Sequence, residues 1–110
     1  MEEIKKAWGH EVCIVNNEKY CGKILSLNRG FQSSLHHHKI KDETFYISKG
    51  KVLVELVLEK GDSVRILPNT QHRFNGLEDS EIIEFSTQHF DEDSYRETKS
   101  GRMKNNDDRK

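Results

Sequence analysis

Apolar and β-branched residues occur in short runs along this chain, and turn-forming residues such as Gly, Asn, Asp and Pro separate the runs. The runs recur about every 8–12 residues, and no stretch shows the period of about 3.6 residues that marks an amphipathic helix. This pattern predicts an all-β fold, either a sandwich or a small antiparallel barrel. The expected strands, about seven or eight in number, lie at residues 10–16, 20–28, 33–39, 43–48, 52–58, 62–67, 72–74 and 81–86.

The segment 52–58 is the most strand-like run of the chain, and its pairing has two solutions. Only ten residues separate Gly50 from Gly61, and none of the residues from 52 to 58 favours a turn. The segment therefore forms either one long strand or a very tight hairpin, and the sequence leaves both open.

The two ends of the chain differ in character from its middle. Residues 1–9 are expected to form a polar N-terminal arm in which Trp8 covers the core, and residues 10–88 to form one barrel domain. From residue 89 onwards the chain is polar and rich in charge. We expect a C-terminal tail at 89–110, in which 90–102 lie along the barrel as a turn or short helix and 103–110 are disordered.

The composition limits the size of the core and the kind of partner. Of the 110 residues, 33% are apolar and 34% are charged, so the core is lean, and we expect a second copy to complete the burial in a homodimer. The net charge is −1, with Lys and Arg scattered among Asp and Glu. Such a surface does not attract nucleic acid or an anionic membrane in general, so we expect a small-molecule partner.

The sequence also bears on the compartment. It contains no run of about 18 apolar residues, and its first residues lack the apolar stretch and cleavage site of a secretory signal. Cys13 and Cys21 do not form a CxxC pair and are too few for a disulfide framework. They are either two reduced thiols or a bridge across one hairpin, and we expect a cytoplasmic protein.

Candidate chemistry concentrates between Gly30 and Gly50. Side chains alternate along a strand, so His36 and His38 point to one face and His37 to the other, where we expect it to be a surface residue. With Glu43 on the next stretch, these two imidazoles supply three ligands of a metal site. Such ligands suit a divalent transition metal ion, and the sequence does not distinguish Mn, Fe, Co, Ni and Zn.

The spacing of these residues resembles a known family. The order Gly30, five residues, His36-x-His38, four residues, Glu43, six residues, Gly50 resembles the first signature of the cupin superfamily. Gly61 followed by Leu67-x-Asn69-x-x-His72 is similar to the second signature, in which Asn69 replaces a Gly; Asn is the best substitute where φ is positive. The resemblance covers about residues 10–88. It implies a cupin-type antiparallel β-barrel (a jelly roll) and the metal ligands His36, His38, Glu43 and His72.

Within that superfamily, the nearest resemblance is to the cupin domain of type II mannose-6-phosphate isomerases. It rests on the stretch Lys6 to Gly9, on Glu81 to Glu84, and on the acidic stretch that leads to Gly101 and Arg102. Those isomerases tend to carry Gln where this chain has His36. The resemblance implies a metal-dependent sugar or sugar-phosphate isomerase. An Fe(II) dioxygenase with the same four ligands and a non-catalytic module that binds a carbohydrate or another small molecule stay open as alternatives.

An isomerase needs a base and a substrate pocket as well as the metal. Alternation places Glu84 on one face of its strand with Ile82 and Ser86, which makes Glu84 a candidate catalytic base, and Lys23 is a second candidate. Lys23, Arg96 and Arg102 are candidates for binding a phosphate. The side chains expected to wall the pocket, because they share parity with a neighbouring ligand, are Phe45, Ile47 and Phe74.

Overall fold

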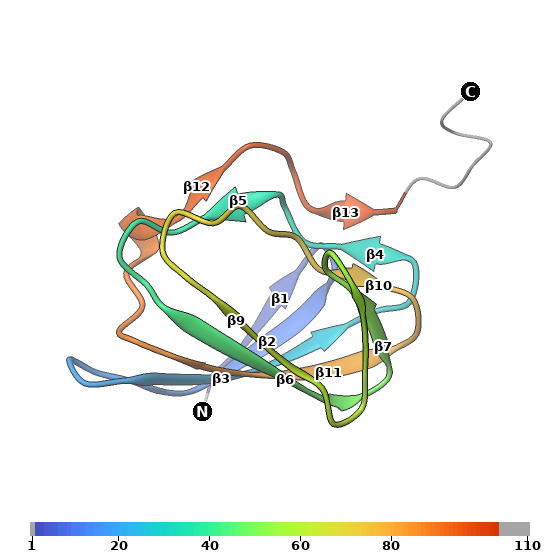
Figure 1. Cartoon of the computed structure of the whole chain (residues 1–110), viewed down its shortest axis with the longest axis horizontal. Helices are drawn as coiled ribbons and strands as arrows, with labels where there is room; N and C mark the ends of the chain where they lie inside the picture. The colour runs from blue at the N-terminus through green and yellow to red at the C-terminus, as the bar shows by residue number, and fades with distance from the viewer. Residues whose placement is uncertain (1, 104–110) are drawn as a thin grey trace.

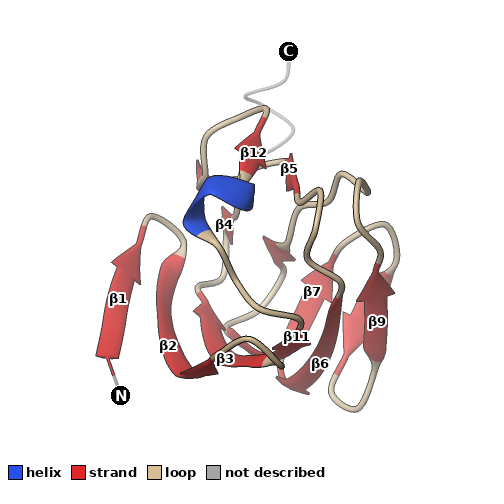
Figure 2. Ribbon diagram, turned by 90° about the vertical axis from the view of Figure 1, so that its left-hand side faces the viewer, coloured by secondary structure: helices blue, strands red, loops and turns tan. Residues whose placement is uncertain are grey.

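The computed structural model describes residues 2–103, and its strands curve around one interior, as Figures 1 and 2 show from two directions. All strand pairs among these residues are antiparallel, as in the expected jelly roll, and the described strands form open sheets rather than one closed barrel. The larger sheet has the order β1-β2-β3-β11-β6-β9. Its strands are β1 (Glu2–Lys6), β2 (Gly9–Asn16), β3 (Cys21–Leu27), β11 (Ser80–Ser86), β6 (Glu43–Lys49) and β9 (Ser63–Ile66).

A smaller sheet and one short strand pair complete the fold. The smaller sheet has the order β13-β4-β10-β7-β8. Its strands are β13 (Gly101–Arg102), β4 (Phe31–Gln32), β10 (Asn75–Gly76), β7 (Lys51–Leu53) and β8 (Val57–Glu59). The short pair joins β5 (His36–His37) to β12 (Tyr95–Arg96), and a single 3-10 turn, η1 (Asp91–Asp93), precedes β12. The expected all-β class is confirmed.

The inner face of the larger sheet changes from apolar to charged along its strands. Alternation buries every second side chain of the three central strands β3, β6 and β11. At one end these inner positions, apart from Ser80, are apolar and form the core with residues of the smaller sheet; they are Leu25, Leu27, Phe45, Ile47 and Ile82. At the other end they are Lys23, Glu43 and Glu84, all less than one tenth exposed. Buried charges need partners, so this end of the interior is where a site is expected.

Three expected strands differ in the structure. The segment 52–58 is a very tight hairpin, with β7 and β8 in register and a bend at residues 54–56 closed by a hydrogen bond from the Val54 N–H to the Leu56 carbonyl over 3.1 Å. The expected strand at 33–39 is ordered as a strand only in β5, and that at 72–74 is reduced to a bridge between His72 and His36. Both segments curve around the interior, so only a few of their residues pair with a neighbouring strand.

The ends of the chain also differ from a simple arm and tail. The segment expected as an arm forms β1, which pairs with β2 from Glu2 opposite Cys13 to Lys6 opposite Gly9, and Trp8 packs against the core as expected. Part of the expected tail returns to the fold, since β12 pairs with β5 and β13 pairs with β4. The disorder expected at 103–110 falls, from residue 104 on, outside the described residues.

The structure also bears on the two cysteines and on membrane-spanning segments. Cys13 and Cys21 are both free thiols, because the register places Cys13 opposite Lys23 and Cys21 opposite Asn16 rather than opposite each other. Within residues 2–103, no helix has the length and apolar character that crossing a bilayer requires.

Gly50 provides a first test of the fold. It joins β6 to β7 with φ of +90°, and a Cβ at this position would meet the Asp79 carbonyl oxygen and Ser80, whose Cα would be 2.7 Å away. Gly61 has a similar φ of +96° with open space around it, so Gly61→Ala is the matched control. We expect Gly61→Ala to lower the free energy of unfolding by about 1–2 kcal/mol and Gly50→Ala by at least about 3 kcal/mol, because overpacking adds to the same strain. Urea unfolding followed by Trp8 fluorescence measures both, and equal losses would contradict the packing argument.

Candidate metal centre and cavity

Three histidines from two separate stretches meet at the charged end of the interior. His36 belongs to β5, His38 follows that strand, and His72 lies between β9 and β10. The backbone joins the two stretches, because the His36 N–H donates to the His72 carbonyl over 3.1 Å and the His72 N–H donates back over 2.8 Å. One ligand nitrogen of each ring lies within 4.8 Å of the others, and His38 and His72 are buried. The structure therefore brings together the three histidines that the sequence proposed.

Each of these rings is oriented by a hydrogen bond to the backbone. In all three, Nδ1 lies within hydrogen-bonding distance of a carbonyl oxygen, which can only accept, so Nδ1 carries the proton and Nε2 keeps its lone pair. The accepting carbonyls are those of Ser34 at 2.7 Å for His36, Asp93 at 3.0 Å for His38 and Thr70 at 3.0 Å for His72. Metal-binding imidazoles are typically held in this way, with the second ring nitrogen fixing the tautomer.

Glu43 completes the candidate ligand set. It begins β6 and is 2% exposed, with Oε2 at 3.3 Å from Nε2 of His72 and Oε1 at 3.6 Å from Nε2 of His38. Among the described residues, Oε2 of Glu43 and Nε2 of His72 have no hydrogen-bond partner although both are buried. Such atoms are rare in native proteins, and an ion between them would satisfy both. Three imidazole nitrogens and a carboxylate therefore fit a divalent transition metal ion.

Asn69 positions the second stretch. Its φ of +66° confirms that Asn replaces Gly at a turn with positive φ. The turn is closed by a hydrogen bond from the Thr70 N–H to the Leu67 carbonyl over 3.3 Å, and the Asn69 N–H donates to the His38 carbonyl over 2.6 Å. The turn thus connects the two signatures directly, three residues before His72.

The surroundings favour the protonation states that a metal ion needs. Burial, together with the neighbouring His72, lowers the pKa of His36 to about 4, and burial also lowers the pKa of His38. Burial by itself would raise the pKa of Glu43, but His72, Lys41 and His38 together lower it to about 2. At neutral pH the rings of His36 and His38 are therefore neutral and Glu43 is ionised, so these ligands release no proton when an ion binds.

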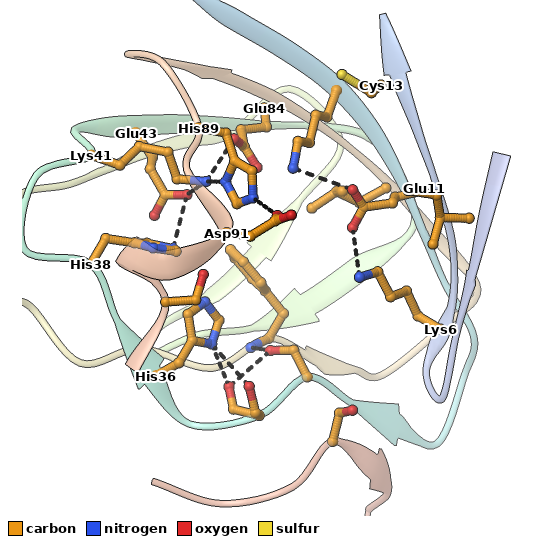
Figure 3. A pocket seen from close by; sticks show the side chains of 18 of the residues that line it. Lys6, Glu11, Cys13, His36, His38, Lys41, Glu43, Glu84, His89 and Asp91 are labelled. Carbon is orange, nitrogen blue, oxygen red and sulfur yellow. Dashed lines mark hydrogen bonds and ion pairs between the residues drawn. The ribbon is translucent and has the colours of Figure 1, made fainter. Parts of the chain in front are cut away.

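His36, His38 and Glu43 line a cavity of about 470 Å³. Figure 3 shows these three residues at one side of the cavity and Lys6 and Glu11 at the other. The wall between them includes the aromatic rings of Trp8, Phe45 and Phe74. A cavity of this size is within the range of about 300–1,000 Å³ that is typical of small-molecule sites.

Lys41 is the centre of a buried ion cluster beside Glu43. Its ammonium group is 3.2 Å from Oε1 of Glu43 and 3.2 Å from Oε2 of Glu84, and it donates to Nδ1 of His89 over 3.0 Å. These three acceptors use all three N–H donors of the ammonium group. Burial would lower the pKa of Lys41, but Glu84 and Glu43 raise it, so Lys41 is charged. Because Nδ1 of His89 accepts this bond, its Nε2 carries the proton and donates to Oδ1 of Asp91 over 3.0 Å.

Asp93 holds the segment that carries Lys41. Its buried carboxylate accepts hydrogen bonds from the backbone N–H groups of Lys39, Ile40 and Lys41, and its carbonyl accepts the one from His38. Sequence reasoning missed Lys41, His89 and Asp93 as parts of the site. No local pattern marks them, since Asp93 and His89 lie in a segment that reads as a polar tail.

The other residues proposed from the sequence fall into two groups. Those that line the cavity are Glu84, Lys23, Phe45, Phe74 and Arg96. Ile47 and Arg102 do not line it. Ile47 is fully buried in the core, two residues after Phe45 on the same face of β6. Arg102 is exposed on β13, with its guanidinium group 5.5 Å from the centre of the Phe31 ring. His37, expected at the surface, is half-buried and stacks on Tyr95 with ring centres 5.2 Å apart.

Comparison with known proteins shows the class of fold. No protein-family model matches this chain, and no curated protein does. The chain is similar to the solved structure of an RmlC-like cupin from Shewanella frigidimarina, with 18% identity, a TM-score of 0.75, and coverage of 83% of this chain and 86% of that one. The chain therefore has the fold of this cupin structure, as the signature spacing implied. The resemblance to mannose-6-phosphate isomerases stays a prediction.

Two further solved structures share this fold. The chain is similar to KdgF from a Halomonas species, with 22% identity, a TM-score of 0.70, and coverage of 76% of this chain and 81% of that one. It is also similar to Pac13, a nucleoside dehydratase from Streptomyces, with 14% identity, a TM-score of 0.77, and coverage of 94% of this chain and 87% of that one. At these identities the likeness shows the fold and not the activity.

Proposed function

We propose that this chain is a metal-dependent cupin enzyme that moves a proton between the carbonyl carbon of a polar, sugar-like substrate and the carbon beside it, as a sugar or sugar-phosphate isomerase does. The observation that carries this proposal is the set of His36, His38, His72 and Glu43, of which the last three are buried, beside a cavity that is also lined by Lys41 and Glu84. An ion held there supplies a Lewis acid for a carbonyl and its neighbouring hydroxyl. The likeness to Pac13 supports a sugar-like substrate.

This reaction requires a base, and Glu84 is the residue that we assign to that role. Its Oε2 is held by Lys41 at 3.2 Å and by the Ser86 hydroxyl at 2.9 Å, so among the described residues Oε1 is the atom left to take a proton. In an aldose–ketose interconversion, Glu84 would take the proton from the hydroxyl-bearing carbon and return it to the former carbonyl carbon. The electrons of the broken C–H bond form the C=C bond of an enediol while the carbonyl oxygen gains a proton. In the second step the other hydroxyl loses its proton and becomes the carbonyl, so no external oxidant or reductant is needed. Lys41 keeps Glu84 in place through both steps.

The test is deuterium exchange. The protein, reloaded in turn with Mn, Fe, Co, Ni and Zn, is incubated in D₂O with a panel of aldoses and aldose phosphates, and NMR follows ketose formation and label at C1 and C2. We expect metal-dependent exchange without oxygen consumption. Oxygen uptake with the same substrates would instead favour the Fe(II) dioxygenase, and ligand binding without exchange for any metal would favour the non-catalytic module.

The assignment of Glu84 has its own prediction. Glu84→Gln keeps the side-chain shape and removes the base, so we expect the exchange rate to fall by at least about 100-fold. Glu81→Gln is the matched control, because Glu81 lies on the same strand with the opposite parity, and it is expected to keep the wild-type rate. Exchange by Glu84→Gln at the wild-type rate would remove Glu84 from the mechanism.

A further inference from the structure

Three charged side chains meet at the wall of the cavity away from the histidines. Lys6 on β1, Glu11 on β2 and Lys23 on β3 come from three neighbouring strands (Figure 3 labels Lys6 and Glu11). The Lys6 ammonium nitrogen is 3.5 Å from Oε1 of Glu11, and that of Lys23 is 3.3 Å from Oε2. Their side chains are 31% exposed for Lys6, 11% for Glu11 and 8% for Lys23. We call these three residues the lysine pair and its bridging glutamate.

This group carries one positive charge in excess. Burial would raise the pKa of Glu11, but Lys23 and Lys6 lower it, so the carboxylate is ionised at neutral pH and balances only one of the two ammonium groups. Glu84 lies opposite Lys23 in the register of β11 and β3, but its Oε2 is already bound by Lys41 and Ser86. Lys6, Glu11 and Lys23 all line the cavity, so the two ammonium groups lie at its wall.

The comparison with Lys41 shows what is left open. Lys41 is 3% exposed and has an acceptor for each of its three N–H donors. Lys23, counted as a whole residue, is 7% exposed. Among the described residues its only acceptor is Glu11. An ammonium group has three donors, so Lys23 keeps two N–H groups for which the cavity must supply acceptors. A nearly buried ammonium group with unmet donors costs free energy unless water or a ligand completes it.

We propose that Lys6 and Lys23, held in place by Glu11, bind the anionic group of the substrate, a phosphate monoester or a carboxylate, while its carbonyl end lies at the histidine cluster. This assignment rests on the proposed function and narrows its substrate class from sugars in general to sugar phosphates or sugar acids. Two ammonium groups, from β1 and β3 on either side of β2, present several donors to one oxyanion, and such charge-assisted bonds are about twice as strong as neutral ones. Glu11 then keeps the two like charges together in the absence of substrate.

The single tryptophan provides the measurement. Trp8 lines the same cavity, so its fluorescence reports on occupation of this wall. The purified protein is titrated with inorganic phosphate and, separately, with glucuronate, at constant ionic strength held with chloride. We expect saturable binding of at least one of the two, and the probe that binds more tightly identifies the anionic group.

Variants locate the binding. We expect Lys23→Met to weaken the affinity for that probe by at least about 10-fold, because a hydrogen bond to a charged group is lost. Lys6→Met, on the edge strand β1, gives a second variant of the same site if Lys23→Met does not fold. Lys5→Met is the matched control, since Lys5 is exposed and points to the opposite face of β1, and it is expected to bind as the wild type does.

The outcomes separate this inference from the proposed function. Unchanged affinity in both Lys23→Met and Lys6→Met, or no saturable binding of either probe, would overturn the anion site, even if uncharged sugars exchange deuterium. Affinity that falls in His38→Ala but not in Lys23→Met would also overturn it, since the anion would then lie on the metal. Anion binding that depends on Lys23, without deuterium exchange by any sugar, would support the site and count against the isomerase alone.

Discussion

His38→Ala loses its divalent metal ion on dialysis, whereas the wild-type protein retains about one ion per chain: this is the largest effect that we expect. Nε2 of His38 is one of three imidazole nitrogens within 4.8 Å, and its ring is fixed by the bond to the Asp93 carbonyl. Loss of a group that only orients a ligand ring, as the Asp93 carbonyl orients His38, typically costs about 10–100-fold in metal affinity. Loss of the ligand itself should therefore cost more than about 100-fold. Elemental analysis after dialysis, together with isothermal titration with the metal alone, measures the change.

His37→Ala is the matched control for this result. His37 is adjacent in sequence and equal in chemistry, but it stacks on Tyr95 and is not a member of the cluster. We expect His37→Ala to retain the metal as the wild type does. If His38→Ala kept its full metal content, or if both variants lost the ion equally, the cluster would not be the metal centre.

Lys41→Met should unfold at much lower urea concentration than the wild type. Its ammonium group is nearly buried between Glu43 and Glu84, and methionine would leave these two carboxylates without their shared counter-charge. Removing one partner of a buried ion pair typically costs about 3–5 kcal/mol, because the remaining buried charge then has neither water nor a counter-charge around it. Urea unfolding followed by Trp8 fluorescence measures this loss on metal-free protein.

Two further variants make this prediction specific. Lys49→Met removes an exposed lysine at the end of β6 and should change the free energy of unfolding by less than about 0.5 kcal/mol. Adding Glu84→Gln to Lys41→Met removes one of the two uncompensated charges, so the double variant should recover part of the lost stability. A Lys41→Met protein as stable as Lys49→Met would show that the buried cluster does not support the fold.

Local spacing along the chain was enough to predict most of the candidate metal centre. His36 and His38 share a face because strands alternate, and the Asn69 turn has the positive φ that its place in the second signature required. Pairing was less accessible. The tight hairpin at 52–58 and the reduction of 72–74 to a single bridge depend on how the two sheets curve around the interior, which no local run of residues records.

Alternation along a strand also could not predict which inner residues line the cavity and which lie in the core. Phe45 and Ile47 occupy equivalent inner positions of β6, yet Phe45 lines the cavity and Ile47 lies in the core. Alternation determines the face of a sheet to which a side chain points, but not how far along the strand the cavity ends.

The sequence by itself determined the all-β class, the faces of the strands, and His36, His38 and Glu43 as candidate ligands, because these follow from alternation and spacing along the chain. His72 was added by the resemblance to the second cupin signature. Only the tertiary structure decided which charges meet: Lys41 reaches Glu84 across 43 positions and His89 across 48, and Asp93 holds the backbone of Lys41 across 52. The meeting of Lys6, Glu11 and Lys23 likewise needs the registers of three strands at once. Charged residues look alike in a sequence, and only burial against specific partners gives each one its role.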